Sequence, residues 1–217
     1  MNKINLLIIL LSSFIIALII GLLSYFQDKK KMYSFLGMFP FELKSNNNLL
    51  LNLIFRIVLA LSISAMSIDS IYLLINNISS VFLTKTLGYL LIVSSIILIT
   101  MFIIDFKSLN THILGSSIFV TFVFIDYLFF GYIALINLND NFFLYQGIIA
   151  IVISVILLLI IVYPSLSSWY KMKKIRNEKT KEEKYERKRV NILALLEWIS
   201  IFLFVGLFIL ISLSNII

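Results

Sequence analysis

The sequence has no cysteine, one histidine and two prolines in 217 residues, and only 13% of its residues are charged. The absence of cysteine excludes disulfide bonds, thiolate metal sites and cysteine nucleophiles. The single histidine, His112, leaves no histidine set for metal binding or for most acid–base catalysis. These absences favour a protein that is not an enzyme, and we expect no cofactor and no metal.

Apolar residues are abundant in this chain. They make up 61% of the sequence, whereas a soluble domain is about 45–50% apolar, and the mean hydropathy is +1.05. The longest polar interval, residues 165–190, is too charged to fold around a core of its own. We therefore predict a single polytopic membrane domain over residues 1–217. The frequent Lys, Ile, Asn and Phe are typical of an AT-rich genome, which favours a bacterial plasma membrane.

Six apolar segments are each long enough to cross a hydrocarbon core of about 30 Å as a helix. They cover residues 4–26, 49–74, 80–104, 113–138, 142–163 and 191–214. Polar turns separate most of them, so we predict an all-α bundle of six transmembrane helices. A further segment, residues 32–41, is aromatic and flanked by lysines, and we expect it to lie in the membrane interface.

The lysines and arginines predict the orientation of the bundle, because short cytoplasmic loops collect basic residues. With both termini outside, fifteen of the eighteen basic residues lie on the cytoplasmic side, and only Lys3 and Lys85 lie outside. Arg56 falls within the membrane. We therefore predict an N-out, C-out topology.

The cytoplasmic loop at residues 165–190 contains ten basic residues and four glutamates. Its composition favours helix, so we predict a charged helical loop between the fifth and sixth spans. Juxtamembrane basic residues gain about 1 kcal/mol each near an anionic leaflet. The predicted lipid contacts are Lys171, Lys173, Lys174, Arg176, Arg187, Lys188 and Arg189. A docking site for a cytoplasmic partner or for nucleic acid is the alternative, and we expect lipid rather than nucleic acid.

One motif in this loop, Glu182-Glu183-Lys-Tyr-Glu-Arg187, matches the EExxxR pattern of the CAAX-type intramembrane proteases. In that family the glutamates lie in membrane helices and act with histidines of later motifs. Here the pattern lies in an aqueous, lysine-rich loop, and no histidine follows it. The catalytic set cannot be assembled, so we interpret the match as chance.

Four charged residues lie within the spans, namely Arg56, Asp69, Asp126 and Glu197. Each is expected to have a partner, because a lone charge near the bilayer centre costs about 2.5–3.5 kcal/mol. Arg56 and Glu197 lie at matching depth near the cytoplasmic side, and we predict an ion pair between them. Asp69 and Lys85 are level across the turn at Asn77, so they form a second candidate pair.

Asp126 has no basic residue at its depth near the middle of the fourth span. It must be protonated, hydrogen-bonded or functional. The favoured interpretation is a hydrogen bond to a nearby Ser, Thr or Tyr; the alternative is a proton or cation relay, or a polar contact with a partner's helix.

Three classes of function remain open. The favoured class is a non-catalytic multi-pass protein, such as an accessory subunit of a secretion or transport complex, or an immunity protein against a membrane-acting toxin. Its expected partners are the bilayer, with an anionic inner leaflet, and possible membrane proteins. The alternatives are a small-solute or ion/proton-coupled carrier that uses Asp126, and an intramembrane enzyme.

Overall fold

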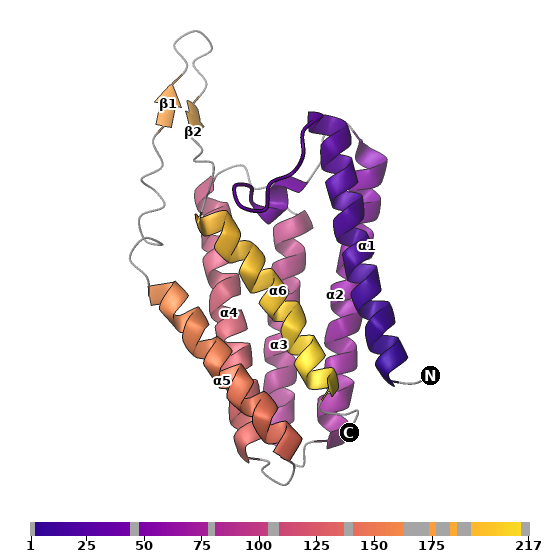
Figure 1. Ribbon diagram of the computed structural model, residues 1–217, viewed down its shortest axis with the longest axis vertical. Helices are drawn as coiled ribbons and strands as arrows, with labels where there is room; N and C mark the ends of the chain where they lie inside the picture. Colours follow the sequence, from indigo (N-terminus) through magenta and orange to yellow (C-terminus); the bar gives the residue numbers. More distant parts are fainter. Residues whose placement is uncertain are drawn as a thin grey trace.

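Six long helices form the protein, as the sequence predicted (Figure 1). The computed structural model describes residues 3–43, 48–77, 81–103, 109–136, 141–162, 174–176, 183–185 and 192–213. The helices are α1 (Lys3–Lys29), α2 (Leu49–Asn77), α3 (Val81–Ile103), α4 (Leu109–Ile136), α5 (Asn141–Val162) and α6 (Ile192–Leu213). Each is long and apolar enough to cross a membrane. The chain is a multi-pass membrane protein.

The outward-facing hydroxyl groups of these helices are suited to lipid. Thr86, Thr100 and Thr121 each donate a hydrogen bond to the carbonyl oxygen four residues earlier in their own helix, at 2.6–2.9 Å. Hydrocarbon offers no partner to a polar group, so such groups must be satisfied within their own segment. These threonines can therefore face lipid at little cost.

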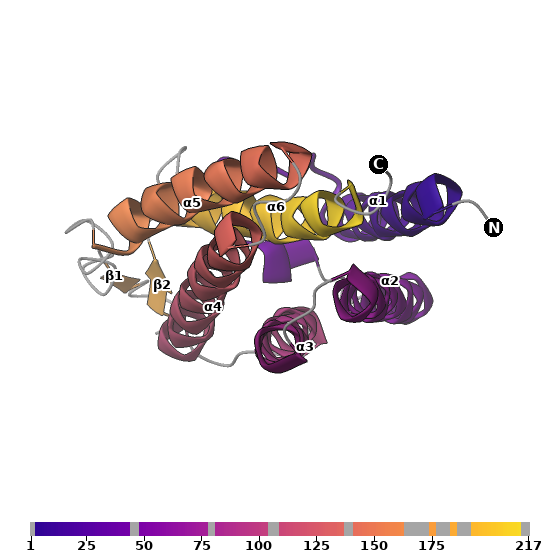
Figure 2. The same cartoon turned by 90° about the horizontal axis from the view of Figure 1, so that it is seen from below.

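The helices are arranged as a ring (Figure 2). Sequential helices are neighbours from α1 to α5, and α6 closes the ring between α5 and α1. Helix α6 also contacts α2 and α4, and its span is the most buried of the six. The start of α1 and the end of α6 lie toward the same end of the bundle (Figure 1). Side chains on α6 are thus the ones that most directly link the helices.

Small residues allow two of the helix pairs to approach closely. A Cβ atom on Gly131 of α4 would lie 2.8 Å from the Ile151 side chain of α5 and 3.2 Å from the Gly147 carbonyl oxygen. On α1, a Cβ atom on Gly21 would lie 2.9 Å from the Phe55 ring of α2. Small residues permit such close packing between membrane helices, so these glycines are used within the chain.

Four tyrosines mark the end of the bundle where α2 turns into α3 and α4 into α5. Tyr72, Tyr89, Tyr132 and Tyr145 are all exposed there, one on each of these helices. Tyrosine is enriched at membrane–water interfaces because its ring is apolar and its hydroxyl is polar. This belt indicates where one surface of the bilayer lies.

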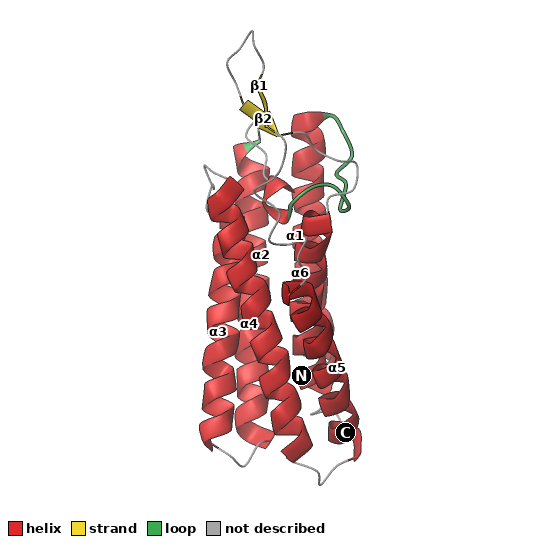
Figure 3. Ribbon diagram, turned by 90° about the vertical axis from the view of Figure 1, so that its left-hand side faces the viewer, coloured by secondary structure: helices red, strands yellow, loops and turns green. Residues whose placement is uncertain are grey.

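The prediction of a helical loop between α5 and α6 was wrong. We expected helix there, whereas Lys174–Arg176 (β1) and Glu183–Tyr185 (β2) pair as antiparallel strands beyond the bundle (Figure 3). The register places Arg176 opposite Glu183. Pairing between two strands satisfies backbone N–H and C=O groups that a helix would otherwise satisfy. This local pairing overrode the helix propensity.

Candidate functional site

The segment after α1 folds back over one end of the helix bundle. Helix α1 ends at Lys29. The next residue, Lys30, has a left-handed φ of 53°, and its N–H donates to the Phe26 carbonyl oxygen at 2.9 Å. The chain then reaches a short 3₁₀ helix, η1 (Pro40–Leu43), which contacts α1, α3 and α6. Phe39 and Leu43 are buried there. Residues 33–43 are called the cap below.

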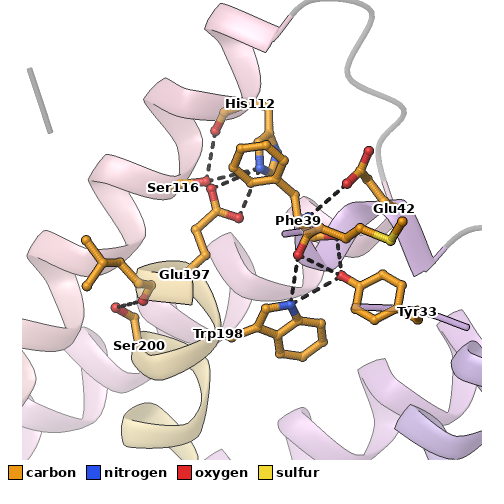
Figure 4. A network of polar contacts seen from close by, with 10 residues as sticks. Tyr33, Phe39, Glu42, His112, Ser116, Glu197, Trp198 and Ser200 are labelled. Carbon is orange, nitrogen blue, oxygen red and sulfur yellow. Dashed lines mark hydrogen bonds and ion pairs between the residues drawn. The ribbon is translucent and has the colours of Figure 1, made fainter. Parts of the chain in front are cut away.

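Hydrogen bonds hold the cap to α6 (Figure 4). The indole N–H of Trp198 lies 3.2 Å from both the Tyr33 hydroxyl and the Met38 carbonyl oxygen. The Tyr33 hydroxyl in turn donates to the Phe39 carbonyl oxygen at 2.7 Å. Burial raises the pKa of Tyr33 far above its ordinary value, so this hydroxyl keeps its proton and remains a donor at physiological pH.

The cap also stabilises its own turn. The Phe39 N–H donates to a carboxylate oxygen of Glu42 at 2.9 Å, three residues ahead. This is the arrangement of a side chain that closes a turn by accepting a backbone N–H. The Tyr33 ring packs edge-on against Trp198 and Tyr25, with ring centres 6.0 and 5.2 Å apart. The cap is therefore fixed by both polar and aromatic contacts.

A histidine and a glutamate meet beneath the cap. Nε2 of His112, on α4, lies 3.0 and 3.1 Å from the two carboxylate oxygens of Glu197, on α6. Their side chains are 0% and 2% exposed. Ser116, one turn further along α4, donates to the His112 carbonyl oxygen at 3.1 Å and lies 3.4 Å from Nε2. The site thus combines groups that are 85 residues apart in sequence.

Aromatic rings of the cap cover the imidazole. The Phe41 ring centre lies 4.0 Å from that of His112, and the Phe39 ring meets it edge-on at 5.4 Å. Figure 4 shows Phe39 and Glu42 on the cap side of the pair and Trp198 below them. The cap therefore shields the His112–Glu197 pair at the loop end of the bundle.

This pair differs from the one that the sequence analysis proposed. Both oxygens of Glu197 lie against His112, at the position where depth matching predicted the Arg56 guanidinium. Arg56, on α2, has a contact of its own, and its predicted ion pair with Glu197 stays a prediction. The predicted fourth span began after His112, whereas α4 begins at Leu109 and carries His112 in its first turn. Depth matching would have found the His112–Glu197 pair if histidine, neutral or charged, had been considered as a partner in addition to lysine and arginine.

The roles predicted for the other charged residues stay predictions. Arg56 and Asp69 are half-buried on α2, and Lys85 is exposed on α3, so the Asp69–Lys85 pair stays a prediction. The proposed lipid contacts Lys171, Lys173, Arg187, Lys188 and Arg189 lie outside the described residues. Lys174 and Arg176 lie in β1, and their contact with lipid also stays a prediction.

Asp126 lies at a second buried polar site. It is 0% exposed, near the middle of the span Leu114–Ile136, and Ser94 of α3 donates to its Oδ2 at 2.5 Å. The structure thus gives Asp126 the kind of partner that the sequence analysis favoured. Oδ1 has no hydrogen-bond partner among the residues that the structure describes. The next residue, Tyr127, donates to the Leu203 carbonyl oxygen of α6 at 2.6 Å.

The described residues hold no group of three or more His, Asp or Glu side chains placed to bind a metal ion. What the two sites offer is narrower: a carboxylate–imidazole pair that can share a proton, and a carboxyl group with one open oxygen. Comparison with protein-family models, curated proteins and solved structures gave no match. The geometry of these sites therefore carries the functional argument.

Proposed function

We propose that this chain is a non-catalytic accessory subunit of a membrane complex, or an immunity protein of the same design, that binds a protein partner at its cap. One observation supports this most directly. The cap is held by the hydrogen bonds of Trp198 and Glu42, yet Met32 beside it is 86% exposed and Leu36 within it is also exposed. These apolar side chains lie outside the candidate membrane spans.

Exposed apolar side chains have different meanings on the spans and on the cap. On the spans, lipid covers them. On the cap, a rigid presentation lowers the entropy cost of binding, which is the property of a preorganised interface. The β1–β2 hairpin extends from the same end of the bundle (Figure 1), so a partner at the cap could also meet its basic residues.

Site-specific photo-crosslinking tests this proposal. A photoreactive amino acid at Met32, activated in intact cells, should form one discrete cross-linked protein product. Met32→Asp combined with Leu36→Asp should abolish co-purification of that product in mild detergent. The matched control is a photoreactive residue at Leu61, which is also apolar and exposed but lies within the α2 span. Cross-links at Met32 to lipid alone would overturn the proposal.

We also propose that the cap faces the cytoplasm of a bacterial plasma membrane, with both termini outside. The support is the charge asymmetry of the sequence, fifteen basic residues against two. A phosphatase that is active only outside the cytoplasm, fused after Ile217, should be active. Activity of a cytoplasmic reporter at the same position would reverse this orientation.

A small-solute or proton-coupled carrier is the second candidate, and one observation favours it. Oδ1 of Asp126 is buried near mid-membrane with no hydrogen-bond partner among the described residues. Buried polar groups normally have partners, and intramembrane carboxyl groups often belong to ion or proton pathways. Asp126→Asn should abolish a transport phenotype at normal expression if the chain is a carrier, and should leave the phenotype intact if Asp126 serves packing.

A further inference from the structure

The net charge of the His112–Glu197 pair depends on how many protons the two side chains hold. A buried carboxylate beside a neutral imidazole leaves a net negative charge in an enclosed site, which is costly because His112 is the one basic side chain against Glu197 among the described residues. One additional proton removes that charge, whether it rests on the carboxylate or on the imidazole. The burial of both side chains, 2% and 0% exposed, therefore favours the pair with its additional proton.

The cap is built to respond to that proton. Glu197 and Trp198 are consecutive residues of α6, and Trp198 donates the hydrogen bonds that fasten the cap at Tyr33 and Met38. The Phe39 and Phe41 rings of the cap cover His112 directly. Movement of these rings would open the site to water. They belong to the same short segment as the Met38 carbonyl oxygen that Trp198 binds and the Phe39 carbonyl oxygen that Tyr33 binds, so we expect the contacts of Trp198 to change with them.

We propose that His112 and Glu197 form a proton-binding site, and that residues 33–43 are its gate. With the proton bound, the pair is neutral and the cap is closed. When the proton leaves to water, Glu197 remains as a carboxylate beside a neutral His112, and the cap opens to hydrate it. This site is independent of whether the exposed residues of the cap bind a protein.

Other titratable groups surround the pair and must be separated from it in any test. Glu42 and Tyr33 belong to the cap, Tyr25 and Asp28 lie at the end of α1, and Arg56 lies on α2. Tyr33 keeps its proton, because burial raises its pKa. Glu42 is the closest alternative, since its carboxylate accepts the Phe39 N–H within the cap.

The single histidine of the chain makes the proton directly observable, because every ¹⁵N-histidine NMR signal comes from His112. In the proton-bound pair Nδ1 carries a hydrogen in both placements of the proton: in the imidazolium, and in the neutral imidazole whose Nε2 accepts from a protonated Glu197. After release, the one ring hydrogen lies on Nε2, facing the carboxylate. Nδ1 should therefore lose its hydrogen as the pH rises.

The gate has its own signal. In a Trp169→Phe background, Trp198 is the only tryptophan, and opening of the cap should shift its fluorescence toward that of hydrated indole. The full-length protein in lipid nanodiscs should show this shift at the pH at which Nδ1 loses its hydrogen. Glu197→Gln should abolish both changes. Asp126→Asn, a change at a buried carboxyl group elsewhere, should leave both in place, and Glu42→Gln should do the same.

Three results would overturn the proposal. The first is an Nδ1 that keeps one state across the pH range in the wild-type protein. The second is a Trp198 fluorescence that does not follow Nδ1, which would remove the gate. The third is a pair of transitions that survives Glu197→Gln or disappears with Glu42→Gln. The wild-type titration alone decides the first two, so the test does not depend on the folding of any pair variant.

Discussion

Glu197 and Asp126 are both buried carboxyl groups in membrane helices, yet the protein treats them differently. Glu197 lies near the loop end of α6, with both oxygens against His112 and a cap of aromatic rings above. Asp126 lies near mid-membrane, with one oxygen bound to Ser94 and the other without a partner in the described part of the chain. Only the first has a titratable partner.

The partner of each carboxyl group determines which charge states its site can hold. A carboxyl group with a neutral hydroxyl partner has to remain uncharged or meet water, because Ser94 cannot supply a compensating charge. A carboxyl group beside an imidazole can exchange a proton with it and remain neutral as a pair. Depth in the bilayer follows the same division, since the group nearer the aqueous end has the partner that can titrate.

The largest effect is expected from removing the partner of Glu197. His112→Ala leaves a buried carboxyl group without its imidazole, and breaking one side of a buried pair costs about 3–5 kcal/mol. We expect a large loss of folded protein, measured by size-exclusion chromatography in detergent and by unfolding in denaturing detergent. Replacing both partners with leucine should recover most of the loss. A double variant as damaged as the single one would contradict a specific pairing.

A smaller effect is expected at the second site. Ser94→Ala removes the hydrogen bond to Asp126 and should cost about 1–3 kcal/mol of unfolding free energy. The control is Thr121→Val, which removes an exposed hydroxyl that bonds only within its own helix, and which should be nearly neutral. If Ser94→Ala were equally neutral, the hydrogen bond at Asp126 would contribute little, and the contrast between the two sites would grow.

The sequence predicted the structure best within the membrane spans, where lipid surrounds the helices. Six apolar runs predicted six helices closely, because a chain in lipid must satisfy its backbone within each span. The hydroxyl partner of Asp126 was also predicted by class, because a carboxyl group without a cation at its depth has few other options. Ser94 itself required the packing of α3 on α4.

The cap and the His112–Glu197 pair were not predictable in the same way. Residues 33–43 form little regular structure, and their fold depends on Trp198, 165 residues from Tyr33. His112 was assigned to a polar turn, because the hydropathy rises only after it, although α4 begins at Leu109. The β1–β2 pair was missed because helix propensity says nothing about backbone pairing between two separate segments.

A local effect should follow from weakening the attachment of the cap. Trp198→Phe keeps an aromatic ring but removes the N–H that donates to Tyr33 and Met38, so it should cost about 1 kcal/mol. Faster amide hydrogen exchange is expected in residues 33–43. Exchange in α5 should stay unchanged and serves as the internal reference. Uniformly faster exchange would mean that Trp198 stabilises the whole bundle instead.

The smallest effect, and the only stabilising one, is expected where α1 meets the cap. Lys30 is the one non-glycine residue with positive φ in the described part of the chain, and glycine adopts that conformation without the steric cost of a Cβ atom. Lys30→Gly should therefore stabilise the protein by less than about 1 kcal/mol, measured as a small rise in Tm. Lys31→Gly removes the same charge at a position without positive φ, so it should give no rise. Because Lys30 lies outside residues 33–43, this change should leave the pH at which Nδ1 of His112 loses its hydrogen unaltered, whereas every change at Glu197 should move or remove that transition. A shift in the His112 transition caused by Lys30→Gly would mean that the end of α1 belongs to the gate together with residues 33–43.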